Sequence, residues 1–218
     1  MADYKNPDYW QLKARQEGYP ARSVYKLDEM NRKFGLLNNP KTGKTMPNLR
    51  VLDLGAAPGS WSLYVLRKIK LQGMLVSVDL SPLSREFDKG LFDQSNFHFI
   101  QGDITAETVK QDIFSRAQYS LLLSDAAPAT TGNRTVDTQR SLELAEAVLV
   151  YAQTALIRGA NMCVKVFQGG DTASVLKRIK ELFSEGKSFK PEACRSESFE
   201  TYYVGLGFKG SGVRGFRG

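Results

Sequence analysis

Residues 49–61, Leu-Arg-Val-Leu-Asp-Leu-Gly-Ala-Ala-Pro-Gly-Ser-Trp, decide the fold of this chain. The first six form a short apolar run, as expected for a buried strand of a parallel sheet, and the run breaks at Gly55 into a turn of small residues. A helix is predicted at residues 60–70, because Leu63, Leu66 and Ile69 recur at helical spacing. A strand, a tight turn and a helix start let the backbone approach a nucleotide-like ligand closely.

Two common nucleotide-binding motifs do not fit this turn. A dinucleotide-binding G-x-G-x-x-G motif needs its second glycine where Ala57 stands. A P-loop needs Gly-Lys-Ser/Thr after the strand, whereas Gly43-Lys44-Thr45 precedes it, with Asn38 at the first P-loop glycine position. The remaining pattern, Asp-x-Gly-x-x-Pro-Gly over residues 53–59, resembles the first motif of class I methyltransferases that bind S-adenosylmethionine. A simple strand-end turn is the alternative.

Length and composition indicate one α/β domain, because 218 residues with 42% hydrophobic and 24% charged side chains can form a single buried core. Within it we expect a basic helical N-terminal extension and loop at 1–48, a catalytic core at 49–208 and a flexible basic tail at 209–218. No apolar segment is long enough to span a membrane, so a cytoplasmic protein is expected. Two distant cysteines and one histidine, His98, predict neither a disulfide framework nor a metal site.

The net charge of +7 is concentrated at the two ends of the chain. Residues 1–50 hold ten basic and five acidic residues, a balance of +5, and residues 208–218 hold three basic residues and no acid. The remaining 17 basic and 18 acidic residues nearly cancel. Basic extensions on a near-neutral core favour contact with a polyanion such as RNA over solubility alone.

The hydrophobic pattern predicts an alternation of strands and helices. Expected strands are 49–54, 74–79, 97–101, 119–125, 160–167, about 189–194 and 200–207. Expected helices are about 7–17 with Asn6 as its cap, 21–34, 60–70, 106–117, 137–157 with Asp137 as its cap, and 171–185. Residues 38–48 and 126–136 are expected to be loops, the second placed to fold over a substrate. The last two strands would place an antiparallel strand in a parallel sheet.

Aspartates recur near the ends of the first four expected strands, at Asp53, Asp79, Asp103 and Asp125. Ligands of open α/β sheets bind at the carboxyl ends of the strands, so these acids are expected to surround a ligand. Asp79 would accept hydrogen bonds from a ribose diol, and Asp103 would accept one from the exocyclic amine of an adenine. Solvated strand ends are the alternative.

Lys165 stands inside the apolar strand 160–167, where an unpaired charge is costly, and this favours a functional role over a snorkelling lysine. In residues 9–26 four aromatic residues alternate with four basic ones, a mixture that can stack on bases and pair with phosphates. For Trp10 we favour core packing. For Arg15 and Arg22 we favour RNA contact.

From about Tyr9 to Lys209 the chain resembles the FtsJ-like (RrmJ-type) RNA ribose 2′-O-methyltransferases. The motifs that carry the resemblance are Arg22-Ser23-x-x-Lys26-Leu27-Asp28-Glu29, residues 53–62, Ser124-Asp125-x-Ala127-Pro128, residues 164–169 (Val-Lys-Val-Phe-Gln-Gly) and Glu200-x-Tyr202. The resemblance implies a Rossmann-like seven-stranded sheet in the order 3-2-1-4-5-7-6 with strand 7 antiparallel. Ser60 departs from the glycine usual in bacterial relatives, a change that the turn is expected to tolerate.

The resemblance also implies the site residues. It implies a catalytic tetrad of Lys26, Asp125, Lys165 and Glu200. The implied S-adenosylmethionine contacts are Asp53, Gly55, Pro58, Gly59, Trp61, Asp79, Leu80, Asp103, Ile104 and Asp125. The expected RNA contacts are Arg15, Arg22, Lys26 and Arg134. Lys165 would either take the proton of the ribose hydroxyl or only orient the oxygen, because burial and Lys26 lower its pKa while Asp125 and Glu200 raise it.

The substrate expected from the sequence is large-subunit (23S) ribosomal RNA, methylated on a uridine by a monomer that needs no metal. The alternatives are a tRNA anticodon loop, a small-molecule substrate, and a non-catalytic RNA-binding module with the same fold. A non-catalytic module would be free to lose Lys165 or Glu200, and both are present. A small-molecule enzyme would leave the basic ends unexplained.

Overall fold

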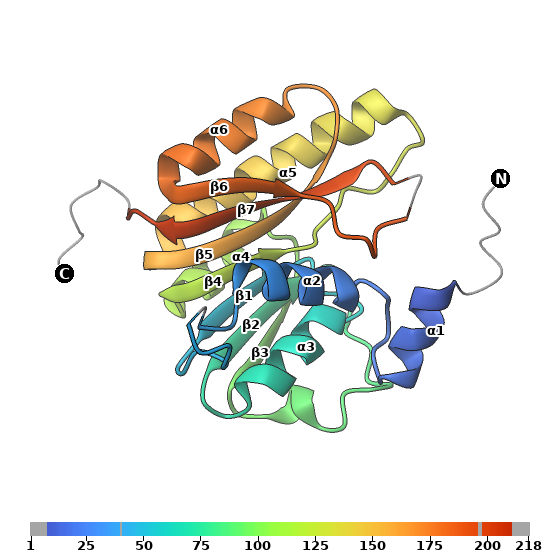
Figure 1. Ribbon diagram of the computed structural model, residues 1–218, viewed down its shortest axis with the longest axis vertical. Helices are drawn as coiled ribbons and strands as arrows, with labels where there is room; N and C mark the ends of the chain where they lie inside the picture. Colours follow the sequence, from blue (N-terminus) through green and yellow to red (C-terminus); the bar gives the residue numbers. More distant parts are fainter. Residues whose placement is uncertain (1–7, 40, 196–197, 211–218) are drawn as a thin grey trace.

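Seven strands form one mixed sheet in the order β3-β2-β1-β4-β5-β7-β6 (Figure 1). The computed structural model describes residues 8–39, 41–195 and 198–210. The strands are β1 (Arg50–Leu54), β2 (Met74–Asp79), β3 (Phe97–Gln101), β4 (Tyr119–Ser124), β5 (Leu156–Phe167), β6 (Phe183–Phe189) and β7 (Glu200–Phe208). β7 runs antiparallel to both β5 and β6, and the other neighbours are parallel. The expected fold class and strand order are confirmed.

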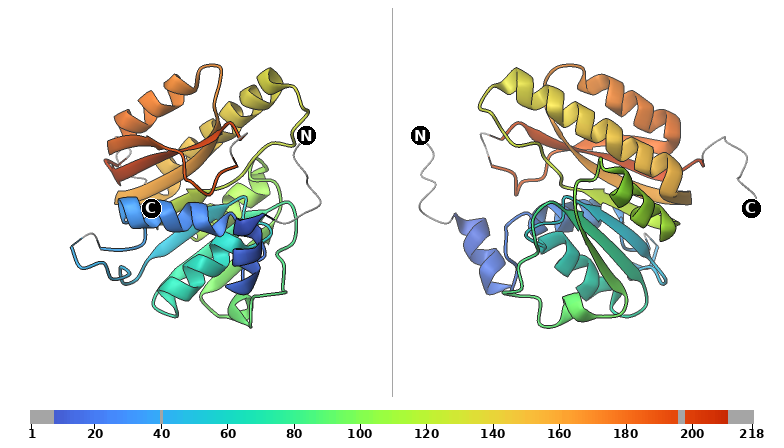
Figure 2. Two further views of the ribbon diagram at one scale, coloured as in Figure 1. Left: turned by 45° about the vertical axis from the view of Figure 1, so that its right-hand side comes forward. Right: turned by 180° about the vertical axis from the view of Figure 1, so that it is seen from behind.

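Helices cover both faces of the sheet (Figures 1 and 2). The helices are α1 (Tyr9–Gln16), α2 (Val24–Phe34), α3 (Ser60–Ile69), α4 (Glu107–Ser115), α5 (Arg134–Ala155) and α6 (Thr172–Leu182), with a 3-10 turn η1 (Leu91–Asp93). Apolar residues of α4, α5 and α6 join one core cluster, and those of α1, α2 and α3 join another on the opposite face. None of the described helices is both long and apolar enough to cross a membrane.

The central strands are apolar throughout because both of their faces are buried. Val51 of β1 belongs to the cluster under α2 and α3, whereas its neighbours Leu52 and Leu54 belong to the cluster under α5. Residues of β4 alternate in the same way between the two clusters. This two-sided burial produces the continuous apolar runs from which these strands were predicted.

The turn after β1 places two backbones in contact. Gly55 has φ +77°, and a Cβ built on it would lie 2.4 Å from the backbone N and Cα of Ala126, which follows β4. Only glycine has room at this position. Gly59, at φ +108°, is the N-terminal cap of α3. The small residues of the turn therefore allow the carboxyl ends of β1 and β4 to approach one another.

The predicted strand at 189–194 is wrong, and so is the predicted extension of α6 to Glu185. α6 begins after its cap, Asp171, and ends at Leu182, and β6 starts at Phe183, which is buried opposite Phe208 of β7. The polar residues of β6 lie at the sheet edge, where one face is exposed, so their strand pattern was weak. Residues 190–195 instead form a loop beside α2.

The predicted boundaries of α5 are also wrong at both ends. Its cap is Asn133, whose side chain accepts from the amides of Thr135 and Val136. Asp137 instead accepts three hydrogen bonds from Thr131 and Gly132, and thereby fixes the preceding loop. The helix ends at Ala155, and residues 156–159 extend β5. Leu142, Ala145, Leu149 and Ala152 of α5 are buried, and so is Leu156 at the start of β5.

The first helix is shorter than predicted. It begins at Tyr9 after Asp8, whose carboxylate accepts from the amide of Gln11 at 2.9 Å. The predicted cap, Asn6, lies outside the described residues, as does the tail from residue 211. The predicted loop 38–48 has no helix among its described residues and contains an isolated bridge between Asn38 and Thr45.

We expect Gly55→Ala to destabilise the fold by more than about 3 kcal/mol, since strain in the left-handed region adds to a backbone clash. Gly43→Ala is the matched control: Gly43 has φ +66°, but a Cβ there would meet nothing within 4 Å. It should cost only about 1–2 kcal/mol. Urea unfolding measures both values. Equal losses in the two variants would refute the close approach as the reason for Gly55.

Candidate active site

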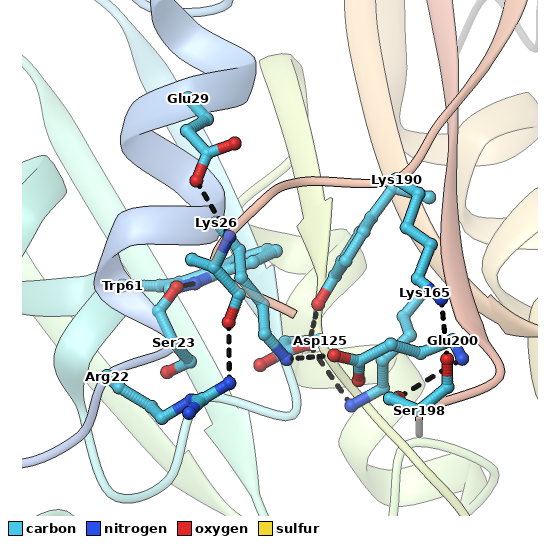
Figure 3. A network of polar contacts seen from close by, with 12 residues as sticks. Arg22, Ser23, Lys26, Glu29, Trp61, Asp125, Lys165, Lys190, Ser198 and Glu200 are labelled. Carbon is cyan, nitrogen blue, oxygen red and sulfur yellow. Dashed lines mark hydrogen bonds and ion pairs between the residues drawn. The ribbon is translucent and has the colours of Figure 1, made fainter. Parts of the chain in front are cut away.

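The four residues expected to act as a tetrad lie together on one face of the sheet (Figure 3). Lys26 comes from α2, Asp125 follows β4, Lys165 lies in β5, and Glu200 begins β7. Lys26 Nζ lies 2.5 Å from Glu200 Oε1, and Lys165 Nζ lies 3.1 Å from Asp125 Oδ1. All four side chains are at most 16% exposed, so the structure brings together two nearly buried ion pairs.

The register of β5 against β7 produces this arrangement. Lys165 lies opposite Tyr202, and Phe167 lies opposite Glu200. Because side chains two residues apart on a strand share a face, Glu200 and Tyr202 project on the same side as Lys165. α2 packs over that face and supplies Lys26. A one-residue slip of β7 would turn Glu200 away from Lys26.

Tyr202 is a member of the site that the sequence analysis did not assign. Its hydroxyl donates to Asp125 Oδ1 at 2.6 Å, the same oxygen that faces Lys165. Its ring is fully buried, and the centre of the ring lies 5.9 Å from the ring centre of Trp61. The signal was its position two residues after Glu200, because that spacing places both residues on one face of an extended strand.

The two ion pairs fix the charges of the site. Burial raises the pKa of the Asp125 carboxyl, but Lys165 and Lys26 outweigh burial, so this pKa is lowered and the carboxylate stays ionised. Burial lowers the pKa of the Lys26 ammonium, but Asp125 and Glu200 outweigh it, so this pKa is raised. Lys26 therefore remains a cation and a hydrogen-bond donor at neutral pH.

Two residues, one in α2 and one in the segment before it, hold the loop that leads to β7. The carboxylate of Glu29 accepts from the amides of Glu192 and Ala193 at 2.8 and 3.0 Å. Arg22 donates to the Ala193 carbonyl at 2.7 Å and pairs with Asp8. We call Arg22 and Glu29 the loop clamp. It ties the approach to Glu200 directly to the helix that carries Lys26.

The expected RNA contacts are placed differently from one another. The guanidinium of Arg22 is engaged in the loop clamp and only 14% exposed. Arg15 is exposed on α1, and Arg134 is exposed at the start of α5, with its guanidinium carbon 5.4 Å from the ring centre of Phe199. Trp10 packs on Tyr25 with ring centres 5.1 Å apart, in agreement with a core role. The RNA contacts stay predictions.

A cavity of about 310 Å³ opens at the carboxyl ends of β1 to β4, beside the tetrad. The lining residues are Gly55, Ala57, Asp79, Leu80, Gly102, Asp103, Ile104, Asp125, Ala126, Ala127 and Leu144. They include six of the expected cofactor contacts. Asp125 belongs both to this lining and to the tetrad, so the cavity and the tetrad meet at one carboxylate.

Two carboxylates of this cavity are held in place by hydrogen bonds. Asp79 accepts from the amides of Ala57 and Ser81 at 2.9 and 2.8 Å. Asp103 accepts on one oxygen from the amide and the hydroxyl of Thr105, and these bonds lower the pKa of its carboxyl. Fixed, ionised acceptors beside an open glycine turn suit a ligand with a ribose diol and an adenine amine.

Four expected cofactor contacts do not line the cavity. Pro58 and Gly59 lie in the turn before α3, and the Trp61 indole is buried and donates to the Ser23 carbonyl at 2.8 Å. Asp53 is fully buried within β1, where Ser62 donates to its Oδ2 at 2.7 Å. Its Oδ1 has no hydrogen-bond partner among the described residues. Contact of these four with the cofactor stays a prediction.

Comparison with known proteins gives the family. A model of the FtsJ-like methyltransferase family matches residues 19–208. The chain belongs to this family. A relative from Treponema denticola named Ribosomal RNA large subunit methyltransferase E is 50% identical, over 95% of this chain and 98% of its own length. One from Borreliella afzelii with the same name is 43% identical, over 92% of this chain and 98% of its own.

A solved structure supports the same assignment. A Plasmodium falciparum protein described as a ribosomal RNA methyltransferase superposes with a TM-score of 0.71 at 25% identity, over 88% of this chain and all of that one. The FtsJ-like chain is therefore an S-adenosylmethionine-dependent methyltransferase. The cavity fits that cofactor, because its two fixed carboxylates match the ribose and adenine groups and its glycine turn leaves space for them.

We expect Asp53 to make folding sensitive to pH. Burial raises the pKa of its carboxyl to about 7, opposed by the Ser62 hydrogen bond and reinforced by Asp125 and Asp79. Since an unfolded aspartate has a pKa of about 3.9, the folded state binds the extra proton between these values. The free energy of unfolding should therefore fall as pH rises from about 4 to about 7.

Asp53→Asn should remove most of this decline, because the amide does not titrate. Urea midpoints from pH 5 to 8 for the wild type and the variant measure it. Glu86→Gln, which removes an exposed carboxylate, is the control and should decline as the wild type does. If the Asp53→Asn protein loses stability in parallel with the wild type, Asp53 is not the titrating group.

Proposed function

We propose that this FtsJ-like enzyme methylates the ribose 2′-oxygen of a uridine in large-subunit (23S) ribosomal RNA. The single observation that carries the proposal is the pairing of Lys26 with Glu200 and of Lys165 with Asp125 beside the cofactor cavity. A ribose hydroxyl is a weak acid, so its methylation needs groups that orient the oxygen and manage its proton. The names of the curated relatives support ribosomal RNA as the substrate.

Bound S-adenosylmethionine supplies an electrophilic methyl group. The residues of the chain do the rest: the Lys26 ammonium donates a hydrogen bond to the ribose oxygen, and Lys165, like Lys26, lies close to Asp125. Asp125 holds Lys165 in place, with Tyr202 donating to the same carboxylate oxygen. Glu200 neutralises Lys26, so an incoming RNA meets oriented donors rather than two unpaired charges.

Lys165→Ala should retain cofactor binding but lower methyl transfer by about 10²- to 10⁴-fold, the usual contribution of a positioned proton-transfer group. Calorimetric titration with S-adenosylmethionine and a single-turnover assay with tritiated cofactor measure the two quantities. Lys187→Ala is a matched control, since Lys187 is an exposed lysine of β6. An active Lys165→Ala enzyme would refute the assignment.

The pH dependence of single turnover separates the two roles of Lys165. If its amine takes the proton of the hydroxyl, the rate should rise about tenfold per pH unit until the amine is neutral. If Lys165 only orients the oxygen as an ammonium, the rate should fall where the ammonium loses its proton. Lys165→Arg should retain much of the orienting function and none of the proton acceptance, because arginine stays protonated.

The substrate is tested by methylation with tritiated S-adenosylmethionine on intact large ribosomal subunits, naked ribosomal RNA and tRNA. We expect incorporation into ribosomal RNA, at a ribose of a uridine, and none into tRNA. Incorporation only into an anticodon loop would establish the tRNA alternative. No incorporation by a protein that binds the cofactor would favour an RNA-binding module.

We propose further that the whole chain acts as one methyltransferase domain, as a cytoplasmic monomer without a metal. Support comes from the shared core of α2, α3 and the sheet, which joins residues before 48 to the rest. Sedimentation of the purified protein tests whether it is a monomer. Activity in the presence of EDTA tests whether it needs a metal. A stable dimer, or loss of activity that added metal restores, would contradict them.

A further inference from the structure

A second cavity, of about 700 Å³, lies beside the first turns of α5, outside the cofactor cavity and the tetrad. We call it the α5 groove. Its lining residues are Arg134, Thr135, Val136, Thr138, Gln139, Arg140, Leu142, Glu143, Gly169 and Gly170. This volume lies within the range of about 300–1,000 Å³ that small organic groups occupy in proteins.

The floor of the α5 groove is apolar and open. Leu142 is buried beneath it, Val136 is 38% exposed, and Gly169 and Gly170 offer bare backbone. Thr138 is only 3% exposed, and its hydroxyl has no hydrogen-bond partner among the described residues. That hydroxyl faces Gly169, where a Cβ would lie 3.2 Å from it. Because this hydroxyl is buried, it adds no polar group to the open part of the groove, and the floor stays apolar.

The rim of the α5 groove carries charge of mainly one sign. Arg134 and Arg140 are exposed there, and the lining includes one carboxylate, Glu143, which accepts from the side-chain amide of Gln139 at 3.2 Å. Asp137, on the same turn as Arg140, is already bonded to Thr131 and Gly132. An apolar floor with a cationic rim suits a planar base that carries a phosphate.

Gln168 and Phe199 connect the α5 groove to the tetrad. Gln168 precedes Gly169 of the groove, and its backbone N–H donates to the Phe199 carbonyl at 2.7 Å. Phe199 immediately precedes Glu200 of the tetrad. Phe167, which pairs with Glu200 in the sheet, contacts the Phe199 ring with centres 4.7 Å apart. The guanidinium carbon of Arg134 lies 5.4 Å from the centre of the Phe199 ring. Phe199 therefore links Arg134, which lines the groove, to Glu200 of the tetrad.

We propose that the α5 groove binds the nucleotide next to the methylated one in single-stranded RNA. The neighbouring base lies on the apolar floor beside Phe199 and Arg134, and its phosphate pairs with Arg140. Stacking on an aromatic ring or an arginine plane accepts any base, so this contact positions the strand without fixing its sequence. The proposal rests on the proposed function, since it requires that the substrate be RNA.

The first test fills the α5 groove. Val136→Trp places a large ring at its floor, and Val150→Trp is the matched control, because Val150 is a 50% exposed valine on the same helix away from the groove. Initial rates of methylation at varied concentrations of large ribosomal subunits, with tritiated S-adenosylmethionine, give KM and kcat. Val136→Trp should raise KM for the subunits by about tenfold or more, with kcat and cofactor affinity unchanged.

The second test removes one positive charge from the rim of the groove, so its result does not depend on how a large new side chain packs. Arg140→Gln should weaken binding of a fluorescent single-stranded RNA oligonucleotide and reduce the slope of log affinity against log salt by about 0.7, as one lost phosphate contact does. Arg158→Gln removes an exposed arginine of β5, three residues beyond the end of α5, and should leave the slope unchanged. Thermal melting with and without S-adenosylmethionine checks that each variant is folded.

The outcomes separate this proposal from the proposed function. A wild-type enzyme that methylates no RNA would refute the proposed function whatever the variants do. An active wild type for which Val136→Trp behaves as Val150→Trp, and Arg140→Gln as Arg158→Gln, would overturn the groove proposal alone. A loss of kcat at unchanged KM in Val136→Trp would also overturn it, because the groove would then shape the tetrad rather than hold RNA.

Discussion

The site depends on the neutralisation of two nearly buried lysines by two carboxylates. Lys26 with Glu200 and Lys165 with Asp125 form alternating charges that no single element could supply, since they come from α2, the end of β4, β5 and β7. Loss of one partner from such a pair leaves an uncompensated charge at a cost of about 3–5 kcal/mol. Both ion pairs therefore form only when the strand register, the docking of α2 and the path of the loop before β7 are all correct.

Asp125 connects the cofactor cavity with the two ion pairs. It lines the cofactor cavity and also faces Lys165, with Tyr202 donating to the same oxygen. The turn at Gly55 makes this possible, because it brings the end of β1 against the residue after Asp125. The cofactor cavity and the two ion pairs thus meet at the carboxyl edge of the sheet, where open α/β folds place their ligands.

Several polar groups near the site are stabilised less well than the rest of the core. Asp53 is fully buried with one oxygen unpartnered among the described residues, and Lys26 is buried on a helix face whose other buried residues are mostly apolar. The loop clamp of Arg22 and Glu29 fixes residues 192–193 to α2. Departures from a fully satisfied core are expected where residues are arranged for chemistry rather than stability.

The sequence by itself determined the sheet and the edge at which the strand-end acids gather, and its resemblance to the FtsJ-like family implied the tetrad. Two-sided burial makes the apolar runs of β1, β2 and β4 unambiguous, and strand-end acids such as Asp79 and Asp103 follow from the direction of parallel strands. Lys165 stood out because a charge inside an apolar strand needs a partner.

Only the tertiary structure decided the partners and the supporting contacts. Tyr202 reaches Asp125 through the antiparallel register of β7, and Arg22 is engaged by Ala193 more than 170 residues away in the chain. The exposed edge strand β6 and the ends of α5 were misplaced, since edge positions and caps are set by local hydrogen bonds that leave little hydrophobic pattern. Which lysine faces which acid depends on distances between elements, and no spacing along the chain encodes those distances.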